Sequence, residues 1–234
     1  MNGIRLRHLV DVAPRVAKRP PAGTEVTFAP MEALSDGLGG LDTSRVKPFE
    51  DVASGSYNFF QDGDVLLAKV TPCFENGKKA LARGLSSGMG FATSEVHVLR
   101  PRPGKIDPRF LVYLLSAENF KAEGVASMTG SGGLRRVSDQ AILNHRPQIT
   151  DLVFQTAIAD FLDKEIGDIQ VLIDKVGGEG AAKNATPGSF LFLLIEKRAS
   201  LITAAVTGQI DPTTYRRNGT TDRALEKIES EMAQ

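Results

Sequence analysis

The feature that most constrains this fold is a change of hydrophobic period near residue 150. Before it, apolar residues form short runs between turn residues such as Asp62-Gly63, which is typical of β-strands. After it, apolar residues recur every three or four positions, which is typical of amphipathic helices. We therefore predict an α+β fold with a β-rich domain over residues 1–150, a helical region over 151–211 and a polar tail over 212–234.

Three strands and one helix can be placed within the β-rich domain. Val96 and Val98 fall on the same face of a predicted strand over residues 95–99. Similar apolar runs predict strands over residues 24–28 and 65–70, and helical spacing of Phe and Leu residues predicts a helix over 108–120.

The helical region contains two amphipathic stretches separated by an interruption at residues 177–188. Thr150 or Asp151 can cap the first helix, and Thr186-Pro187 resembles the start of the second, which Gly208 ends. The two apolar stripes need a cover, which the other helix, the first domain or a second chain can supply. At near coiled-coil spacing, the positions that we predict at a dimer or partner interface are Ile158, Phe161, Leu162, Ile169, Leu172, Ile173, Leu194 and Leu201.

Composition excludes several classes of protein. One cysteine in 234 residues rules out an internal disulfide and fits a reducing compartment, the cytoplasm. The longest apolar run, residues 190–195, is far shorter than the roughly 18 residues of a bilayer span, and the first residues lack the apolar core of a signal peptide. The sequence has no Walker loop, no dinucleotide-binding glycine motif and no residues at metal-ligand spacing, so we expect no cofactor and no metal.

The net charge is zero, but it is unevenly distributed. Residues 69–109 carry eight basic and three acidic side chains, whereas residues 150–176 carry two basic and six acidic ones. A basic body joined to an acidic segment can direct one face toward nucleic acid. On charge alone, an ordinary solvated surface explains the pattern as well.

Two local patterns suggest chemistry. Cys73 and His97 are the pair that resembles a thiol nucleophile with its base, although nothing in the sequence brings them together and cysteine is commonly a buried packing residue. A glycine-rich turn over residues 129–133 precedes Arg135 and Arg136. Its backbone amides could bind a phosphate with which these arginines pair, or it is only a flexible turn.

Seven stretches of the sequence follow one another in the order found in one family of proteins. The first five are VTFAPMEALSDGLGGLDTS, FFQDGDVLLAKVTPCFENGKKALARGL, SEVHVLRP, RFLVYLL and MTGSGGLRRV. They resemble the target recognition domains of specificity subunits from type I restriction–modification systems. The last two, QTAIADFLDKEIGDIQVLIDK and LLIEKRASLITAAVTGQID, resemble the helical spacer that follows such a domain. The resemblance covers residues 1–211.

The resemblance implies a sequence-specific DNA-binding subunit that is not itself an enzyme. Its partners would be double-stranded DNA and the methyltransferase and restriction subunits, which carry the S-adenosylmethionine and ATP chemistry. Residues 64–70 would form a core strand and residues 71–79 a hairpin toward DNA, with Asn76-Gly77 as its tight turn and Cys73 as a packing residue. The predicted DNA contacts are Lys69, Thr71, Asn76, Lys78, Lys79, Ser131, Arg135 and Arg136.

Two departures from the family pattern shape the predictions. Full-length specificity subunits are built as a tandem pair of recognition domains, whereas this sequence carries one. The spacer of the family is usually one uninterrupted helix, whereas residues 177–188 interrupt the helical pattern here. We therefore predict a homodimer that recognises an inverted repeat around a gap, with the interrupting residues looped out. The alternatives are a helical homodimeric structural or regulatory protein without DNA binding and, third, a cysteine-dependent hydrolase.

Overall fold

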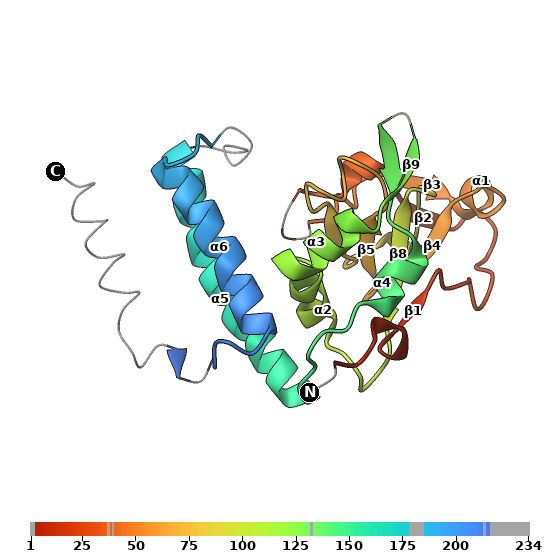
Figure 1. Ribbon diagram of the computed structural model, residues 1–234. Helices are drawn as coiled ribbons and strands as arrows, with labels where there is room; N and C mark the ends of the chain where they lie inside the picture. The colour runs from red at the N-terminus through yellow and green to blue at the C-terminus, as the bar shows by residue number, and fades with distance from the viewer. Residues whose placement is uncertain are drawn as a thin grey trace.

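The computed structural model describes residues 3–36, 38, 40–131, 133–177, 185–212 and 214–215. A β-rich part and a pair of long helices lie side by side, joined at the lower end of the helices (Figure 1). The predicted α+β class is confirmed. Most of the predicted polar tail lies outside the described residues.

Two four-stranded sheets and one hairpin make up the β-rich part. The first sheet is antiparallel, in the order β1 (Val10–Val12), β8 (Val96–Pro101), β5 (Val65–Ala68) and β6 (Lys79–Leu81). The second has the order β3 (Val46–Pro48), β2 (Glu25–Ala29), β7 (Met89–Ala92) and β4 (Asn58–Gln61), with β2 and β7 parallel. The hairpin pairs β9 (Thr129–Ser131) with β10 (Leu134–Arg136).

Strand β5 is buried at all four positions because the first sheet is covered on both faces. Val65 and Leu67 belong to the core that includes the helices, whereas Leu66 belongs to a second core with Val96 and Val98. Alternating residues of one strand therefore contribute to two cores. The predicted strands over residues 24–28, 65–70 and 95–99 correspond to β2, β5 and β8.

Short helices connect the strands. They are η1 (Leu6–His8), η2 (Met31–Ala33), α1 (Phe49–Ala53), η3 (Ser86–Gly88), α2 (Pro108–Leu114), α3 (Glu118–Ala126) and α4 (Asp139–Asn144). The single helix predicted over residues 108–120 is wrong, because α2 ends at Leu114 and α3 begins at Glu118. Asp107 starts α2 by accepting hydrogen bonds from the backbone amides of Arg109 and Phe110.

The two long helices are α5 (Leu152–Gly177) and α6 (Phe190–Val206), which run antiparallel and pack along each other (Figure 1). Asp151 caps α5 as predicted, through a bond to the Phe154 amide, and Gly208 follows α6 with a positive φ of 74°. The predicted cap Thr186 is wrong: Ser189 caps α6 by accepting from the Phe192 amide. The predicted interruption falls between the helices, and its residues 178–184 lie outside the described residues.

The apolar stripes of the two helices cover each other and pack against α2. Six of the eight positions predicted at a dimer interface are at most 6% exposed within this one chain, and Phe161 and Leu172 pack partly buried against the same core. Of the three possible covers, the structure shows the other helix and the first domain, so these positions pack inside this chain rather than at an interface with a second one. The exposed apolar side chains of the pair are Leu152, Val153, Val171, Val176 and Leu193.

Candidate nucleic-acid interface

The structure joins two of the predicted DNA-contacting segments into one surface. The backbone amide of Thr71 donates to the carbonyl of Arg135 at 3.0 Å, and the Arg135 amide donates to Thr71 Oγ1 at 2.9 Å. The Val137 amide donates to the Lys69 carbonyl at 3.0 Å. Strand β10 thus extends the ladder of the first sheet beyond β5. The hairpin β9–β10 projects from this junction at the top of the β-rich part (Figure 1).

The connection between β5 and β6 is one helical turn rather than the predicted Asn-Gly hairpin turn. The Phe74 amide donates to the Val70 carbonyl, and the Lys78 amide donates to the Cys73 carbonyl. Together with the bond from the Gly77 amide to the Phe74 carbonyl, this is a Schellman motif, in which Gly77 takes the left-handed conformation at φ 72°. Gly77 therefore ends a helical turn instead of forming a two-residue reversal.

The eight predicted DNA contacts differ in how far their side chains are exposed. Asn76, Ser131, Arg135 and Arg136 are exposed, and Lys69 and Thr71 are half-buried. Lys78 is engaged inside the fold, because its Nζ donates to the Leu34 carbonyl at 2.8 Å and lies 3.5 Å from Asp36 Oδ1. Lys78 thus connects the segment that follows η2 to the start of β6 in the first sheet.

Lys79 is buried, so its prediction as a surface contact is wrong. Its residue is 2% exposed, and its Nζ donates to the Gly77 carbonyl at 3.0 Å. Burial, together with the positive charges of Lys121 and Arg198, lowers the pKa of Lys79 to about 7. Lys78 directly precedes β6 and its carbonyl accepts from the Ala68 amide of β5, so strand alternation sends the Lys78 and Lys79 side chains to opposite faces.

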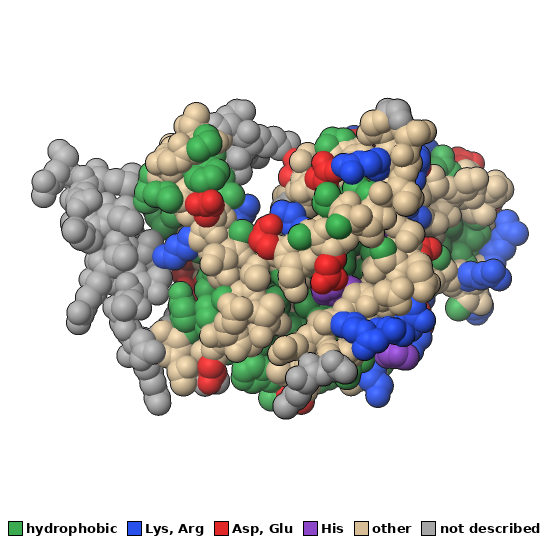
Figure 2. All heavy atoms as spheres, in the orientation of Figure 1, with side chains coloured by type: hydrophobic (Ala, Val, Ile, Leu, Met, Phe, Trp, Pro, Cys, Tyr) green, Lys and Arg blue, Asp and Glu red, His purple; other side chains and the backbone are tan. Residues whose placement is uncertain are grey.

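Each exposed arginine of β10 pairs with its own glutamate. Arg135 Nη2 lies 3.2 Å from Glu75 Oε1, whereas Arg136 donates from Nε and Nη2 to both Glu95 oxygens at 2.8 and 2.9 Å. The hydrogen bond from Arg136 lowers the pKa of Glu95. Basic and acidic side chains lie next to one another below the tip of the hairpin in Figure 2. Sequence reasoning missed both glutamates, which lie 41 or more residues from their partners.

His97 is a structural residue that joins β8 to the start of α4. Its Nε2 lies 3.1 Å from the Val137 carbonyl oxygen, and its Nδ1 lies 2.6 Å from Asp139 Oδ1. Burial lowers the pKa of His97. Because both ring nitrogens face acceptors within the fold, neither is placed to take a proton from Cys73, which lies in the turn after β5.

A cluster of charged residues fixes the β-rich part to the helices. Arg109 Nη1 donates to Asp160 at 2.6 Å and to Asp163 at 2.8 Å, and Tyr113 Oη donates to the other oxygen of Asp163 at 2.6 Å. Burial raises the pKa of the Tyr113 phenol. Buried Gln155 accepts from the Asp107 amide at 3.0 Å. Part of the predicted charge asymmetry is thus neutralised within the chain.

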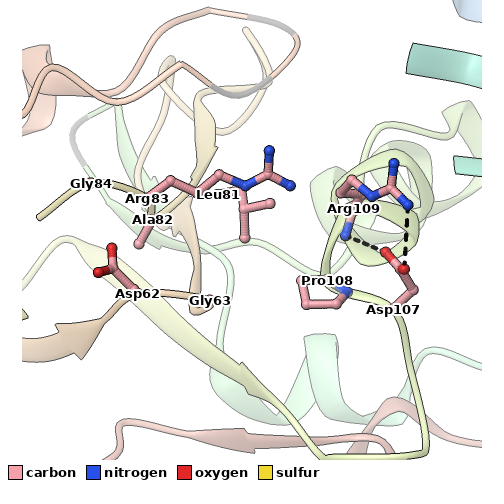
Figure 3. A pocket seen from close by; sticks show the side chains of 9 residues that line it. All are labelled: Asp62, Gly63, Leu81, Ala82, Arg83, Gly84, Asp107, Pro108 and Arg109. Atoms are coloured by element: carbon pink, nitrogen blue, oxygen red, sulfur yellow. Dashed lines mark hydrogen bonds and ion pairs between the residues drawn. The ribbon is translucent and has the colours of Figure 1, made fainter. Parts of the chain in front are cut away.

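A pocket of about 310 Å³ lies where the turn after β6 approaches the start of α2 (Figure 3). Arg83 extends into it, while the Arg109 guanidinium forms an ion pair with Asp107 at 3.7 Å on its other side. Asp62 Oδ1 accepts from the Leu85 amide. None of the predicted DNA contacts lines this pocket. Among the described residues, no group of side chains is arranged to bind a metal ion, and no helix is suited to crossing a bilayer.

No family model matches the chain. The specificity subunits of the type I restriction enzymes EcoAI and EcoEI of Escherichia coli are 41% and 37% identical to it over 113 residues. Each matched stretch is 48% of this chain but only 19% of the relative, so the chain spans a small part of those proteins. A protein of Mycoplasma genitalium named acetate kinase matches at 28% identity, over 51% of this chain and 32% of its own length.

Solved structures share the fold. The HsdS subunit from Thermoanaerobacter tengcongensis matches with a TM-score of 0.56 at 15% identity, over 80% of this chain and 50% of that one. A chain from a study of complex assembly and conformational transition in a type I R-M system matches with a TM-score of 0.51 at 17% identity, over 88% and 46%. The two sequence matches at 41% and 37% identity are to specificity subunits, the solved structures show the same fold, and the acetate kinase match stands apart from both. The chain is therefore a relative of the specificity subunits of type I restriction–modification systems.

Proposed function

We propose that this chain binds double-stranded DNA sequence-specifically, as the specificity subunit of a type I restriction–modification complex. The observation that carries the proposal is the pairing of Thr71 with Arg135, which makes one exposed surface from two segments about 60 residues apart. Its side chains supply guanidinium, amide and hydroxyl groups, the donors that bind phosphates and base edges. One such surface reads one half of a bipartite target.

The helix pair is the proposed docking site for the methyltransferase and restriction subunits. It stands beside the β-rich part (Figure 1), and it exposes Val153, Val171 and Leu193 at 83%, 53% and 53%. A second copy of this chain would have to use the same outer positions, since the inner stripes are already covered. In this proposal the chain contributes recognition in the cytoplasm and performs no chemistry.

Methylome sequencing of cells with and without this gene tests the proposal. Loss of methylation at one bipartite motif is the expected result. A full chain that shows no salt-dependent binding to duplex DNA, with an unchanged methylome, would favour a structural or regulatory role instead. Light scattering of the full chain at micromolar concentration tests the homodimer, which a monomer would exclude.

A further inference from the structure

Arg136 is held more firmly than any other exposed basic residue described on the hairpin surface. Its backbone pairs with Thr129 in β9 on one side and forms a bridge with Val70 on the other. Its side chain is bound through two hydrogen bonds to Glu95. The Glu95 carbonyl in turn accepts from the Lys69 amide at 2.8 Å, which fixes that residue to the end of β5.

The pattern of hydrogen bonds leaves a particular set of donors unused. A guanidinium group presents five N–H donors, arranged so that two parallel pairs can each bind a planar acceptor. Glu95 occupies the pair formed by Nε and Nη2. The end-on pair, formed by Nη1 and the second hydrogen of Nη2, bonds to no acceptor among the described residues. The Arg136 side chain is 45% exposed, so a ligand can reach that pair.

We propose that Arg136 determines specificity by donating its end-on pair to O6 and N7 of a guanine in the major groove, with Glu95 as the residue that positions it. This inference rests on the proposed DNA-binding function. Bidentate donation from arginine is the commonest specific contact to guanine. A guanidinium fixed by a second group on a rigid strand is already oriented for that contact and loses little freedom on binding.

Arg135 provides an internal contrast. It makes one side-chain bond, to Glu75 at 3.2 Å, which leaves its plane free to rotate. Side chains of consecutive strand residues also point to opposite faces, so the two arginines cannot approach the same base. We assign Arg135 to the phosphate backbone, where a positive charge matters more than a fixed plane.

The test uses the full chain, assembled with the modification subunit, and a duplex library with a randomised centre. Bound duplexes from wild type, Arg136→Lys, Glu95→Gln and Arg135→Lys are sequenced. Arg136→Lys keeps the charge but loses the bidentate donors, so preference for guanine at one position should fall by roughly 5- to 140-fold. Glu95→Gln should relax the same position in part, and Arg135→Lys should keep every base preference.

Two outcomes overturn the inference while leaving the proposed function intact. One is that wild type and Arg136→Lys enrich the same motif. The other is that Arg136→Lys weakens binding to all sequences equally, which makes Arg136 a phosphate contact. If wild type enriches no motif, the proposed function and this inference fail together. Unchanged thermal unfolding of the variants shows that a loss of preference is not a loss of fold.

Discussion

The β9–β10 surface and the contact between α2 and α5 both depend on arginines paired with carboxylates, yet the pairs differ. Arg109, whose side chain is 25% exposed, bonds to Asp160 and Asp163 and lies 3.7 Å from Asp107. Arg136, whose side chain is 45% exposed, bonds to a single carboxylate. An arginine surrounded by acids in a partly buried contact stabilises the fold, whereas an exposed one with unused donors can bind a ligand.

The largest effect is expected at Lys79, the buried cation beside the helix pair. Its folded-state pKa of about 7 is below the unfolded value, so the folded state binds fewer protons between about pH 7 and 10. Stability should therefore rise with pH across this window, by as much as about 1.4 kcal/mol per pH unit. Urea unfolding at pH 7, 8 and 9 measures the slope.

Lys79→Met is the matched variant, because it keeps the length of the side chain and removes its charge. It should unfold at higher urea than wild type at pH 7 and lose most of the pH slope. Lys121→Met removes a charge that helps to lower the Lys79 pKa, so it should keep a slope, over a window that begins at a higher pH. A wild-type slope that persists in Lys79→Met would mean that another group titrates.

Arg109→Ala should cost about 2–3 kcal/mol of unfolding free energy. The change leaves Asp160 and Asp163 without their shared cation and removes hydrogen bonds between α2 and α5. Arg102→Ala is the control, since Arg102 pairs with Asp11 at the surface with side-chain exposures of 42% and 55%. That variant should lose less than about 1 kcal/mol. Equal losses in the two variants would contradict a special role for the α2–α5 contact.

These positions show what the sequence could predict. The period change near residue 150 depends only on neighbours along the chain, so α5 and α6 were predictable within a few residues. The alternation of Lys78 and Lys79 was visible too, and strand geometry would have excluded one of the two from the predicted contacts without saying which. The pairing of Arg136 with Glu95 was not visible, because it depends on how β10 meets the end of β5.

The cover of the helical stripes was also beyond the sequence. Periodicity shows that Ile158 and Leu201 need apolar neighbours, but not whether these come from the same chain or a second one. The chain reverses direction between α5 and α6, so the neighbours come from the same chain. The family resemblance implies one continuous spacer helix and therefore argued against an antiparallel pair of helices. The pattern of the residues alone allowed such a pair.

A smaller effect is expected on the salt dependence of DNA binding, where a change at Arg135 should matter and a change at Lys78 should not. Arg135→Ala should weaken binding to all sequences and reduce the slope of log affinity against log salt by about one. Lys78→Met should leave that slope unchanged, because Lys78 bonds to the Leu34 carbonyl and lies near Asp36. Fluorescence anisotropy with a labelled duplex at several salt concentrations measures both slopes. A reduced slope in Lys78→Met would show that this contact opens when DNA binds.

The smallest effect is expected at Cys73. It lies half-buried in the helical turn after β5, and its carbonyl, not its thiol, receives the bond from the Lys78 amide that closes the Schellman motif. Serine keeps that backbone bond and nearly the same volume, so Cys73→Ser should change stability by less than about 1 kcal/mol.

His97, the one base proposed for the thiol from sequence, already bonds to Val137 and contacts Asp139. Cells that carry Cys73→Ser should therefore keep full methylation at the target motif. A folded Cys73→Ser chain with lost methylation would make the thiol part of the function and return the cysteine hypothesis.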